Sequence, residues 1–325
     1  MHARVARIDR TGGPEVIAWH DVDLPPPGRG EVTVRHEAVG LNFIDVYHRN
    51  GVYPVAFPAG LGFEAAGVVE AVGEGVEEVA VGDRVGSFTG ERGAYASARN
   101  VAVGDVVKLP DAIDSRTAAA LMLKGCTAEF LVERCAKVQA GQTVLVHAAA
   151  GGVGHLLVGW LKAIGATVIG TVGSAAKVER ATAAGADHVL LSRGEDVALR
   201  VRALTGGAGV PVILDGVGRA TWPVSLACAA RRGLIVSYGN ASGTIEGVNL
   251  GILAAKGSLF LTRPTLFDYC VTRAEKQASL DRVLAMLAAG AIRPEIGQEF
   301  ALEDAADAHR ALEAGGTQGS TVLVV

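Results

Sequence analysis

The stretch HAAAGGVGHLL, residues 147 to 157, places three alanines and three glycines between two apolar runs. TVLVHAAA, the first run, is typical of a strand, and HLLVGWLKAIGA, which follows the glycines, is typical of a helix. A strand, a glycine turn and a helix in this order can bind a pyrophosphate, because N–H groups and the dipole at a helix N-terminus attract anions. We expect the glycines to adopt positive φ in this turn. Ala149 takes the first position of the GxGxxG pattern, and Gly151 and Gly154 take the others. The alternative is a helix packed closely on a strand without a ligand.

The end of the next strand, in IGTVGSAAK, indicates which dinucleotide is bound. A site for NAD places Asp or Glu about 20 residues after the glycines, where it binds the ribose 2′-OH. Here Gly173 stands in that neighbourhood, Ser174 follows it, and Lys177 comes one turn later. Loss of an anion and gain of a hydroxyl and a cation favour a 2′-phosphate, so the sequence predicts NADPH rather than NADH. The alternative for Lys177 is an ordinary solvated lysine.

Composition limits the class of protein. Of the 325 residues, 50% are hydrophobic and 20% are charged, which is typical of a compact globular chain of about two domains. Lysine and arginine number 30 against 34 acidic residues without long blocks of one sign, which counts against nucleic acid as a partner. The four cysteines form no CxxC pair, which favours reduced thiols. The sequence MHARVARIDRTGGPEV lacks the apolar run of a secretion signal, and Lys162 and Gly165 interrupt the most apolar window. We expect a cytoplasmic protein without a membrane span.

Two parts of the chain differ in their pattern. Residues 4 to 110 contain short β-branched runs broken by turn clusters such as PPPGRGE and TGERG, which predicts a β-rich domain. Residues 115 to 260 alternate helices with apolar strands such as TVIGTV, HVLLS, PVILDGVG and GLIVSYG. This alternation predicts a parallel sheet with helices on both faces. After residue 264 we expect helices in KQASLDRVLAMLAAG and EDAADAHRALEAGG and a closing strand, STVLVV.

Further motifs cover nearly the whole chain. They are LNFIDVYHRNGVYP at 41 to 54, GFEAAGVV at 62 to 69, LMLKGCTA at 121 to 128, HAAAGGVG, GTVGSAAK, DGVGRATW, SYGNASG, GVNLGIL, LTRPTL and TQGS. In order and spacing the chain resembles the zinc-free NADPH:quinone oxidoreductases, the zeta-crystallin-like branch of the medium-chain dehydrogenase/reductase superfamily.

The resemblance implies an α/β fold with two domains. A GroES-like partly open β-barrel domain would comprise residues 1–123 and 265–325, and a Rossmann domain with a doubly wound parallel sheet would comprise residues 124–264 and bind NADPH. The nicotinamide would lie in the cleft between them, where such ligands usually bind. The resemblance also implies a homodimer formed through the edge strand of the Rossmann sheet, within GSLFLTRP, which would cover an exposed apolar strand.

No metal site is expected. Zinc-dependent relatives carry ligands where this chain has Asn42, Phe63 and Leu123, and the chain has no four-cysteine cluster or HxxxH spacing. An ordinary ketone needs a Lewis acid to stabilise the developing alkoxide, whereas a quinone becomes aromatic on reduction and spreads the charge. The expected substrates are therefore conjugated electrophiles, either quinones or enones.

The resemblance assigns a catalytic role to four residues near the nicotinamide or its substrate: Asn42, Tyr47, Tyr53 and Lys124. Both tyrosines can donate to a carbonyl and stack on a flat ring, or they are ordinary barrel residues. Lys124 would steady the ribose or an anionic product, and its alternative is a surface salt bridge.

Four neighbouring residues are expected to have other roles. For Asp45 and Arg49 the spacing favours a local ion pair over catalysis. Glu64 is expected to be an orienting or a structural group rather than a base. Cys126 is expected to be a buried thiol, since no histidine adjoins it in the sequence.

The residues that the resemblance assigns to the cofactor mostly follow the predicted strands, where parallel sheets bind ligands. They are Asn42, Thr127, Gly151, Gly152, Val153, Gly154, Gly173, Ser174, Lys177, Ser192, Arg193, Val217, Tyr238, Gly239, Asn240, Ala241, Ser242, Thr262 and Arg263.

Two residues depart from the family pattern. The family commonly stacks a tyrosine on adenine where this chain has Ser192, and Arg193 beside it can replace that ring by cation–π stacking and add charge for the 2′-phosphate. Phe63 stands where close relatives have threonine, which predicts a narrower or reshaped pocket.

Two alternative functions stay open. The same zinc-free scaffold serves 2-alkenal and enoyl reductases, and the pocket residues do not decide between these and quinone reduction. A non-enzymatic NADPH- or RNA-binding protein of the zeta-crystallin type is the other alternative. The net charge of -4 and the absence of an arginine-rich face count against RNA.

Overall fold

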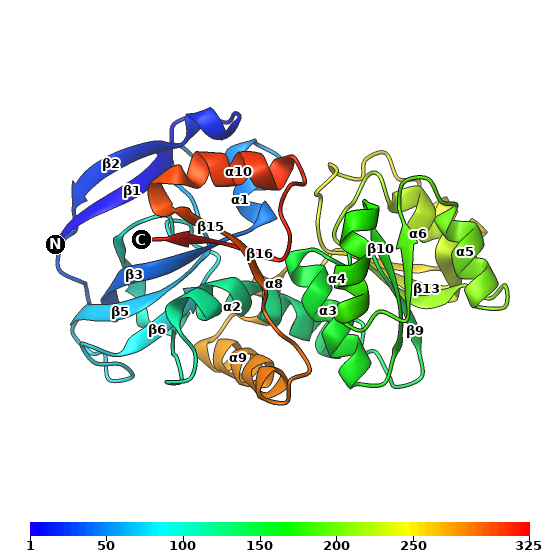
Figure 1. The fold of residues 1–325 in the computed structure, drawn as a ribbon. Coiled ribbons are helices and arrows are strands. Elements are labelled where there is room, and N and C mark those ends of the chain that lie inside the picture. The colour runs from blue at the N-terminus through cyan, green and yellow to red at the C-terminus, as the bar shows by residue number, and fades with distance from the viewer. The chain divides into compact units, whose positions relative to one another are not determined.

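The computed structural model describes residues 1–325, which divide into two compact units (Figure 1). Unit 1 comprises residues 1–124, 270–280 and 294–325, and unit 2 comprises residues 125–269 and 281–293. No β-sheet is shared between the units, and each unit has its own buried apolar core. The domain limits expected from the sequence stay a prediction.

Unit 1 is built on two β-sheets. The smaller sheet has the strand order β2-β1-β4, and the larger has the order β15-β16-β3-β5-β6-β8, with β7 also paired to β3. Valines 32, 34 and 39 of β3 are buried, as expected where β-branched side chains pack on a sheet. The strands are β1 (His2–Ile8), β2 (Ala18–Asp23), β3 (Glu31–Leu41), β4 (Ala59–Gly60), β5 (Glu64–Val72), β6 (Arg84–Phe88), β7 (Ala98–Ala102), β8 (Val106–Lys108), β15 (Ile296–Ala301) and β16 (Ser320–Val324).

Helices complete unit 1. They are α1 (Phe43–Arg49), α10 (Ala305–Glu313), and parts of α2 (Ser115–Glu129) and α9 (Arg273–Ala288), with 3-10 turns at Pro14–Val16, Val103–Asp105 and Leu302–Asp304. The backbone N–H of Asn42 donates to Asp45 Oδ2 at 2.8 Å, which caps α1 directly after β3. The helices and the closing strand predicted after residue 264 are therefore present as α9, α10 and β16.

Unit 2 is a six-stranded parallel sheet in the order β11-β10-β9-β12-β13-β14. Counted along the chain within this unit, the order is third, second, first, fourth, fifth and sixth, which is the doubly wound Rossmann arrangement. The predicted fold class, α/β with a GroES-like and a Rossmann domain, is confirmed. The strands are β9 (Thr143–Val146), β10 (Thr167–Val172), β11 (His188–Leu191), β12 (Val210–Asp215), β13 (Ala229–Ser237) and β14 (Phe260–Thr262).

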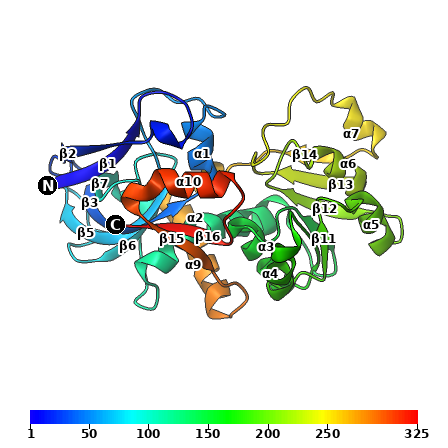
Figure 2. The ribbon, with the colours of Figure 1, turned by 45° about the horizontal axis from the view of Figure 1, so that its top comes forward.

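Helices cover both faces of the Rossmann sheet. Figure 1 shows α3 and α4 on one side of the sheet and α5 and α6 on the other, and Figure 2 shows β14 next to β13 at the end of the sheet. No helix is long and apolar enough to span a bilayer. The helical segments are α3 (Gly152–Ala163), α4 (Val178–Ala183), α5 (Val197–Leu204), α6 (Trp222–Cys228), α7 (Gly251–Ala255) and α8 (Leu266–Tyr269), with a π-helix at Phe130–Cys135 and a 3-10 turn at Ala175–Lys177.

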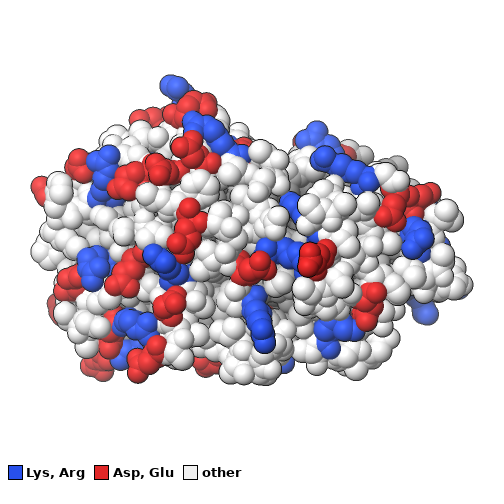
Figure 3. All heavy atoms as spheres, viewed as in Figure 1, with Lys and Arg blue, Asp and Glu red and all other residues white.

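Acidic and basic side chains are interspersed on the face drawn in Figure 3. Many of the charged groups form ion pairs within one unit, such as Arg35 with Glu70 at 2.6 Å and Lys162 with Asp187 at 2.8 Å. Exposed pairs of this kind add little stability, so the fold depends mainly on the buried apolar clusters.

Candidate functional site

The glycine turn lies between β9 and α3. Strand β9 ends at Val146, earlier than the predicted run, because the chain turns at Ala148, where φ is 54°. The expectation that the glycines supply the positive φ is therefore wrong. Gly154 serves close packing instead, since a Cβ at this position would lie 2.1 Å from the carbonyl oxygen of Ala148. Helix α3 begins at Gly152, and its first N–H groups have no partner within the helix, so they can bind an anion.

The ends of β10 and β11 lie side by side. Val172 is paired with Leu191, and the Ser192 N–H donates to Val172 O at 2.8 Å. Gly173, next along the chain, is exposed, and a Cβ added there would meet nothing within 4 Å.

This paired end carries the groups predicted to bind the 2′-phosphate. Ser174, Ser192 and Arg193 are exposed, and Lys177 is half-buried in the 3-10 turn that follows β10. Two hydroxyls and two cations lie close to the positions that follow β10 and β11. The residues present fit a phosphorylated dinucleotide such as NADPH.

The turns after β12 and β13 are joined by hydrogen bonds. Tyr238 N–H donates to Asp215 O at 2.8 Å, and Ser242 N–H donates to Val217 O at 2.8 Å. Arg263, which follows β14, donates from Nη1 to Ser237 O at 2.7 Å. The predicted cofactor residues of these three strands therefore gather at one edge of the sheet, the edge that binds ligands in doubly wound folds.

A buried polar network supports that edge, and none of the sequence motifs indicated it. Asp215 Oδ1 accepts from Val217 N–H at 2.9 Å, and Asp215 Oδ2 accepts from Ser225 Oγ at 2.9 Å. His147 lies 3.1 Å from Ser225 Oγ through Nε2 and 3.0 Å from Thr171 Oγ1 through Nδ1. Burial lowers the pKa of His147, so the ring is neutral at pH 7. The available signal was a polar residue at or near the end of three apolar strands, namely His147, Thr171 and Asp215, whereas Ser225 lies in α6.

In unit 1, Glu64 joins two of the predicted catalytic residues. Its side chain is fully buried, and Oε1 accepts from Asn42 Nδ2 at 2.7 Å and from Lys124 Nζ at 3.3 Å. Oε2 accepts from the backbone N–H of Leu123 at 2.8 Å. The alternative expected for Lys124 was a salt bridge at the surface. Lys124 does form a salt bridge, with Glu64, but this pair is buried, because the side chain of Lys124 is only 6% exposed and that of Glu64 is fully buried.

A second buried carboxylate lies close by, and it corrects one prediction. Asp45 does not pair with Arg49, since its Oδ2 accepts from the Tyr95 hydroxyl at 3.1 Å in addition to the Asn42 N–H. Arg49 instead forms an ion pair with Glu313 of α10 at 2.7 Å. Burial is the main cause that raises the pKa of Asp45 to about 7.

His309 completes this second cluster. Its Nδ1 lies 3.4 Å from Arg49 Nη1, and its Nε2 lies 3.0 Å from the Tyr95 hydroxyl. Because a guanidinium only donates, we infer that Nδ1 accepts and that Nε2 carries the hydrogen. Burial, and then the charge of Arg49, lower the pKa of His309 to about 3, which agrees with this neutral tautomer.

The predicted tyrosines belong to an aromatic cluster of unit 1. The rings of Tyr47 and Tyr53 pack edge to face, with 5.2 Å between their centroids. The ring centroid of His48 lies 5.5 Å from that of Tyr53 and 5.2 Å from that of Phe63. Phe63 is 1% exposed and packs against the ring of His48. Its predicted effect on a substrate pocket stays a prediction. Cys126 is fully buried, as expected.

Comparison with known proteins identifies the family. A family model described as "Alcohol dehydrogenase GroES-like domain" matches residues 28–111, and one described as "Zinc-binding dehydrogenase" matches residues 152–290. The chain is 50% identical over 314 residues to a quinone oxidoreductase of Pseudomonas aeruginosa, covering 96% of this chain and 97% of the relative. The chain belongs to the quinone oxidoreductase family of the medium-chain dehydrogenases/reductases.

Other members of this family are similar over their whole length. A crystal structure of Escherichia coli quinone oxidoreductase complexed with NADPH has a TM-score of 0.97 at 44% identity, covering 99% of this chain and 100% of that one. A 2-haloacrylate reductase of a Burkholderia species is 40% identical over 326 residues, covering 98% of both chains.

The residues present do not fit the zinc ion that one family description implies. At the positions where zinc-dependent relatives carry ligands, this chain has the amide of Asn42, the ring of Phe63 and the aliphatic side chain of Leu123, whereas zinc prefers imidazole and thiolate ligands. No group of three or more His, Cys, Asp or Glu side chains has the arrangement to hold a metal. The side chains present therefore offer no ligand set for zinc.

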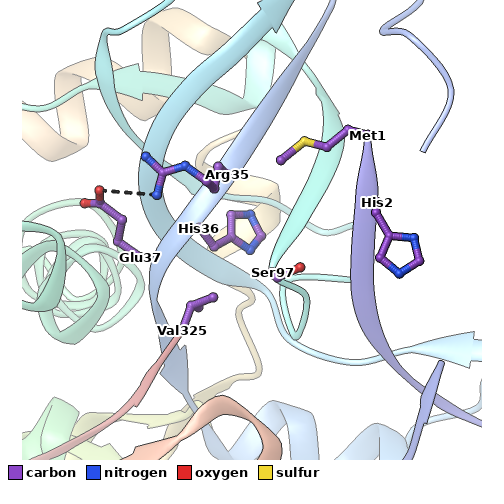
Figure 4. A pocket seen from close by; sticks show the side chains of 7 residues that line it. All are labelled: Met1, His2, Arg35, His36, Glu37, Ser97 and Val325. Atoms are coloured by element: carbon purple, nitrogen blue, oxygen red, sulfur yellow. Dashed lines mark ion pairs between the residues drawn. The ribbon is translucent and has the colours of Figure 1, made fainter. Parts of the chain in front are cut away.

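A pocket of about 300 Å³ opens elsewhere on unit 1 (Figure 4). None of the predicted site residues lines it. Its buried His36 bonds through Nδ1 to Ala96 O at 2.8 Å, and burial followed by Arg99 lowers its pKa to about 3. The lining residues are Met1, His2, Arg35, His36, Glu37, Ser97 and Val325.

Proposed function

We propose that this protein is an NADPH-dependent quinone oxidoreductase that works without a metal. The observation that carries the proposal is its 50% identity to a quinone oxidoreductase over 96% of the chain. The β10–β11 end of the Rossmann sheet supports the choice of cofactor, because it offers hydroxyls and cations where an NAD site needs a carboxylate.

The reaction gives each group of residues a role. NADPH supplies a hydride when bound, and the quinone takes up that hydride and a proton to become a hydroquinone. Lys177 and Arg193 pair with the 2′-phosphate, and the first turn of α3 binds the pyrophosphate. Tyr47 and Tyr53 donate hydrogen bonds to the quinone, and the ammonium of Lys124 offsets the negative charge that develops.

Steady-state assays with NADPH test this function. The acceptors are a benzoquinone, a naphthoquinone and a 2-alkenal, each at matched concentrations. The proposal predicts higher kcat/KM with at least one quinone than with the alkenal. A clear preference for the alkenal would reject quinone reduction and support the second candidate, an enone reductase, which the similarity to a 2-haloacrylate reductase favours.

We further propose a cytoplasmic homodimer formed through β14. This strand pairs only with β13, and its side chains Phe260 and Leu261 are 61% and 37% exposed. An exposed apolar edge strand is normally covered, and pairing with a second copy would cover it. The small number of cysteines supports the cytoplasm, and cell fractionation tests that location.

A further inference from the structure

Glu64 contacts two of the candidate catalytic residues, Asn42 and Lys124, and has no exposed surface of its own. Its two oxygens accept three hydrogen bonds, from the Asn42 amide, the Lys124 ammonium and the Leu123 N–H. Asn42 Nδ2 also lies 3.4 Å from Gly40 O. The amide nitrogen of Asn42 is thus directed toward Glu64 and β3, and the carbonyl Oδ1 faces away from Glu64.

The backbone beside Glu64 leaves space for this carboxylate. A Cβ at Gly40, on the neighbouring strand β3, would lie 2.2 Å from Glu64 Oε1 and 2.3 Å from Ala119 O. A side chain at position 40 would displace Glu64 or helix α2. The close contact shows that β3, β5 and α2 fix the carboxylate in one place.

We propose that Glu64 is a positioning residue, which orients the Asn42 amide and holds the Lys124 ammonium for the reaction without contacting the substrate. The inference rests on the proposed function. An ionised carboxylate only accepts hydrogen bonds, so it allows only one orientation of the amide. Glu64 is poorly placed to act as a base, because a proton on it would displace one of three donors.

The test is a double-mutant cycle between Glu64→Gln and Asn42→Ala. In the Glu64→Gln variant the new amide offers one oxygen and one NH2 group, so either Leu123 N–H or the Asn42 and Lys124 donors would face the NH2 group. A displacement of about 1 Å in a reacting site typically costs about 100-fold in rate. We expect kcat to fall by about that factor in E64Q, and to fall less than threefold further when E64Q is added to N42A, because coupled residues are not additive.

Asp45→Asn is the matched control. Asp45 is as deeply buried as Glu64, and its carboxylate accepts from the backbone N–H of Asn42 rather than from the Asn42 side chain. A general effect of replacing a buried carboxyl group with an amide would appear in both variants, whereas the positioning role predicts that D45N keeps kcat within threefold. Full kcat in E64Q, or an undiminished effect in the N42A background, would overturn the proposal.

The same double-mutant cycle is also measured without turnover, by determining the dissociation constant for NADPH of each variant from protein fluorescence. Rates are measured with whichever acceptor the parent protein reduces best, so an alkenal preference would reject the proposed function and leave this test intact. If E64Q does not fold, Glu64→Asp replaces it, since it keeps the charge and shortens the reach. An E64D effect that simply adds to N42A also contradicts the proposal.

Discussion

In the proposed function, Lys177 distinguishes NADPH from NADH, which lacks the 2′-phosphate. Lys177→Ala should raise KM for NADPH by a factor that corresponds to about 1 to 3 kcal/mol, because a charged hydrogen bond to the 2′-phosphate is lost. KM for NADH should be unchanged. Steady-state rates with both cofactors and one quinone measure this. The exposed Lys256 of the same unit provides the control, Lys256→Ala, which should change neither value. Equal effects of K177A on both cofactors would refute the role.

Asp45 predicts a pH dependence of stability. Its pKa is about 7 in the folded protein against 3.8 for an ordinary aspartate, so between these values the folded state holds more protons than the unfolded state. The free energy of unfolding should therefore fall as pH rises through this window, by at most about 1.4 kcal/mol per pH unit. Asp45→Asn removes that loss. The melting temperature of the variant minus that of the parent should therefore be larger at pH 8 than at pH 5.

The comparison of variant and parent isolates this group. His36 and His309, with pKa values lowered to about 3, contribute the opposite slope below pH 6.5, and they are present in both proteins. A melting-temperature difference between D45N and parent that is the same at both pH values would contradict the prediction.

Residue types were easier to predict than their partners. The motif around Asn42 and Lys124 identified both as candidates, and Glu64 was expected to be an orienting or structural group, but nothing in the sequence indicated that its carboxylate joins these two residues. Spacing alone suggested that Arg49 pairs with Asp45. The actual partner of Arg49, Glu313, lies 264 positions away, and only the packing of α10 against α1 brings the two together.

At the scale of elements, close packing at the turn between β9 and α3 yields a test. Gly154→Ala would place a Cβ 2.1 Å from Ala148 O, so helix and turn must separate. We expect a lower melting temperature and at least a tenfold rise in the NADPH dissociation constant, because the N–H groups of the first helical turn shift. Gly104→Ala is the control, since a Cβ there meets nothing within 4 Å. Parent-like NADPH binding in G154A would show that this packing does not shape the cofactor site.

Elements were predictable where hydrophobic patterns are long. Alternation of apolar strands with helices indicated the Rossmann arrangement, since parallel strands buried on both faces must be connected by helices. Local backbone angles were less accessible. The positive φ fell on Ala148 instead of a glycine, because the turn needs its glycine where the helix approaches most closely. A glycine in a sequence pattern does not show whether it is needed for a positive φ or for close packing.

At the scale of the whole molecule, the exposed face of β14 predicts the assembly state. The parent should elute in light-scattering chromatography with twice the chain mass of 33.3 kDa. Phe260→Arg would place a charge in the middle of the proposed interface, which typically costs about 2 kcal/mol or more, and should shift the protein toward monomer. Leu199→Arg is the matched control, because Leu199 is 66% exposed on α5 of the same unit and should tolerate the charge without dissociation. A monomeric parent, or an F260R protein that stays dimeric at low micromolar concentration, would exclude β14 as the interface.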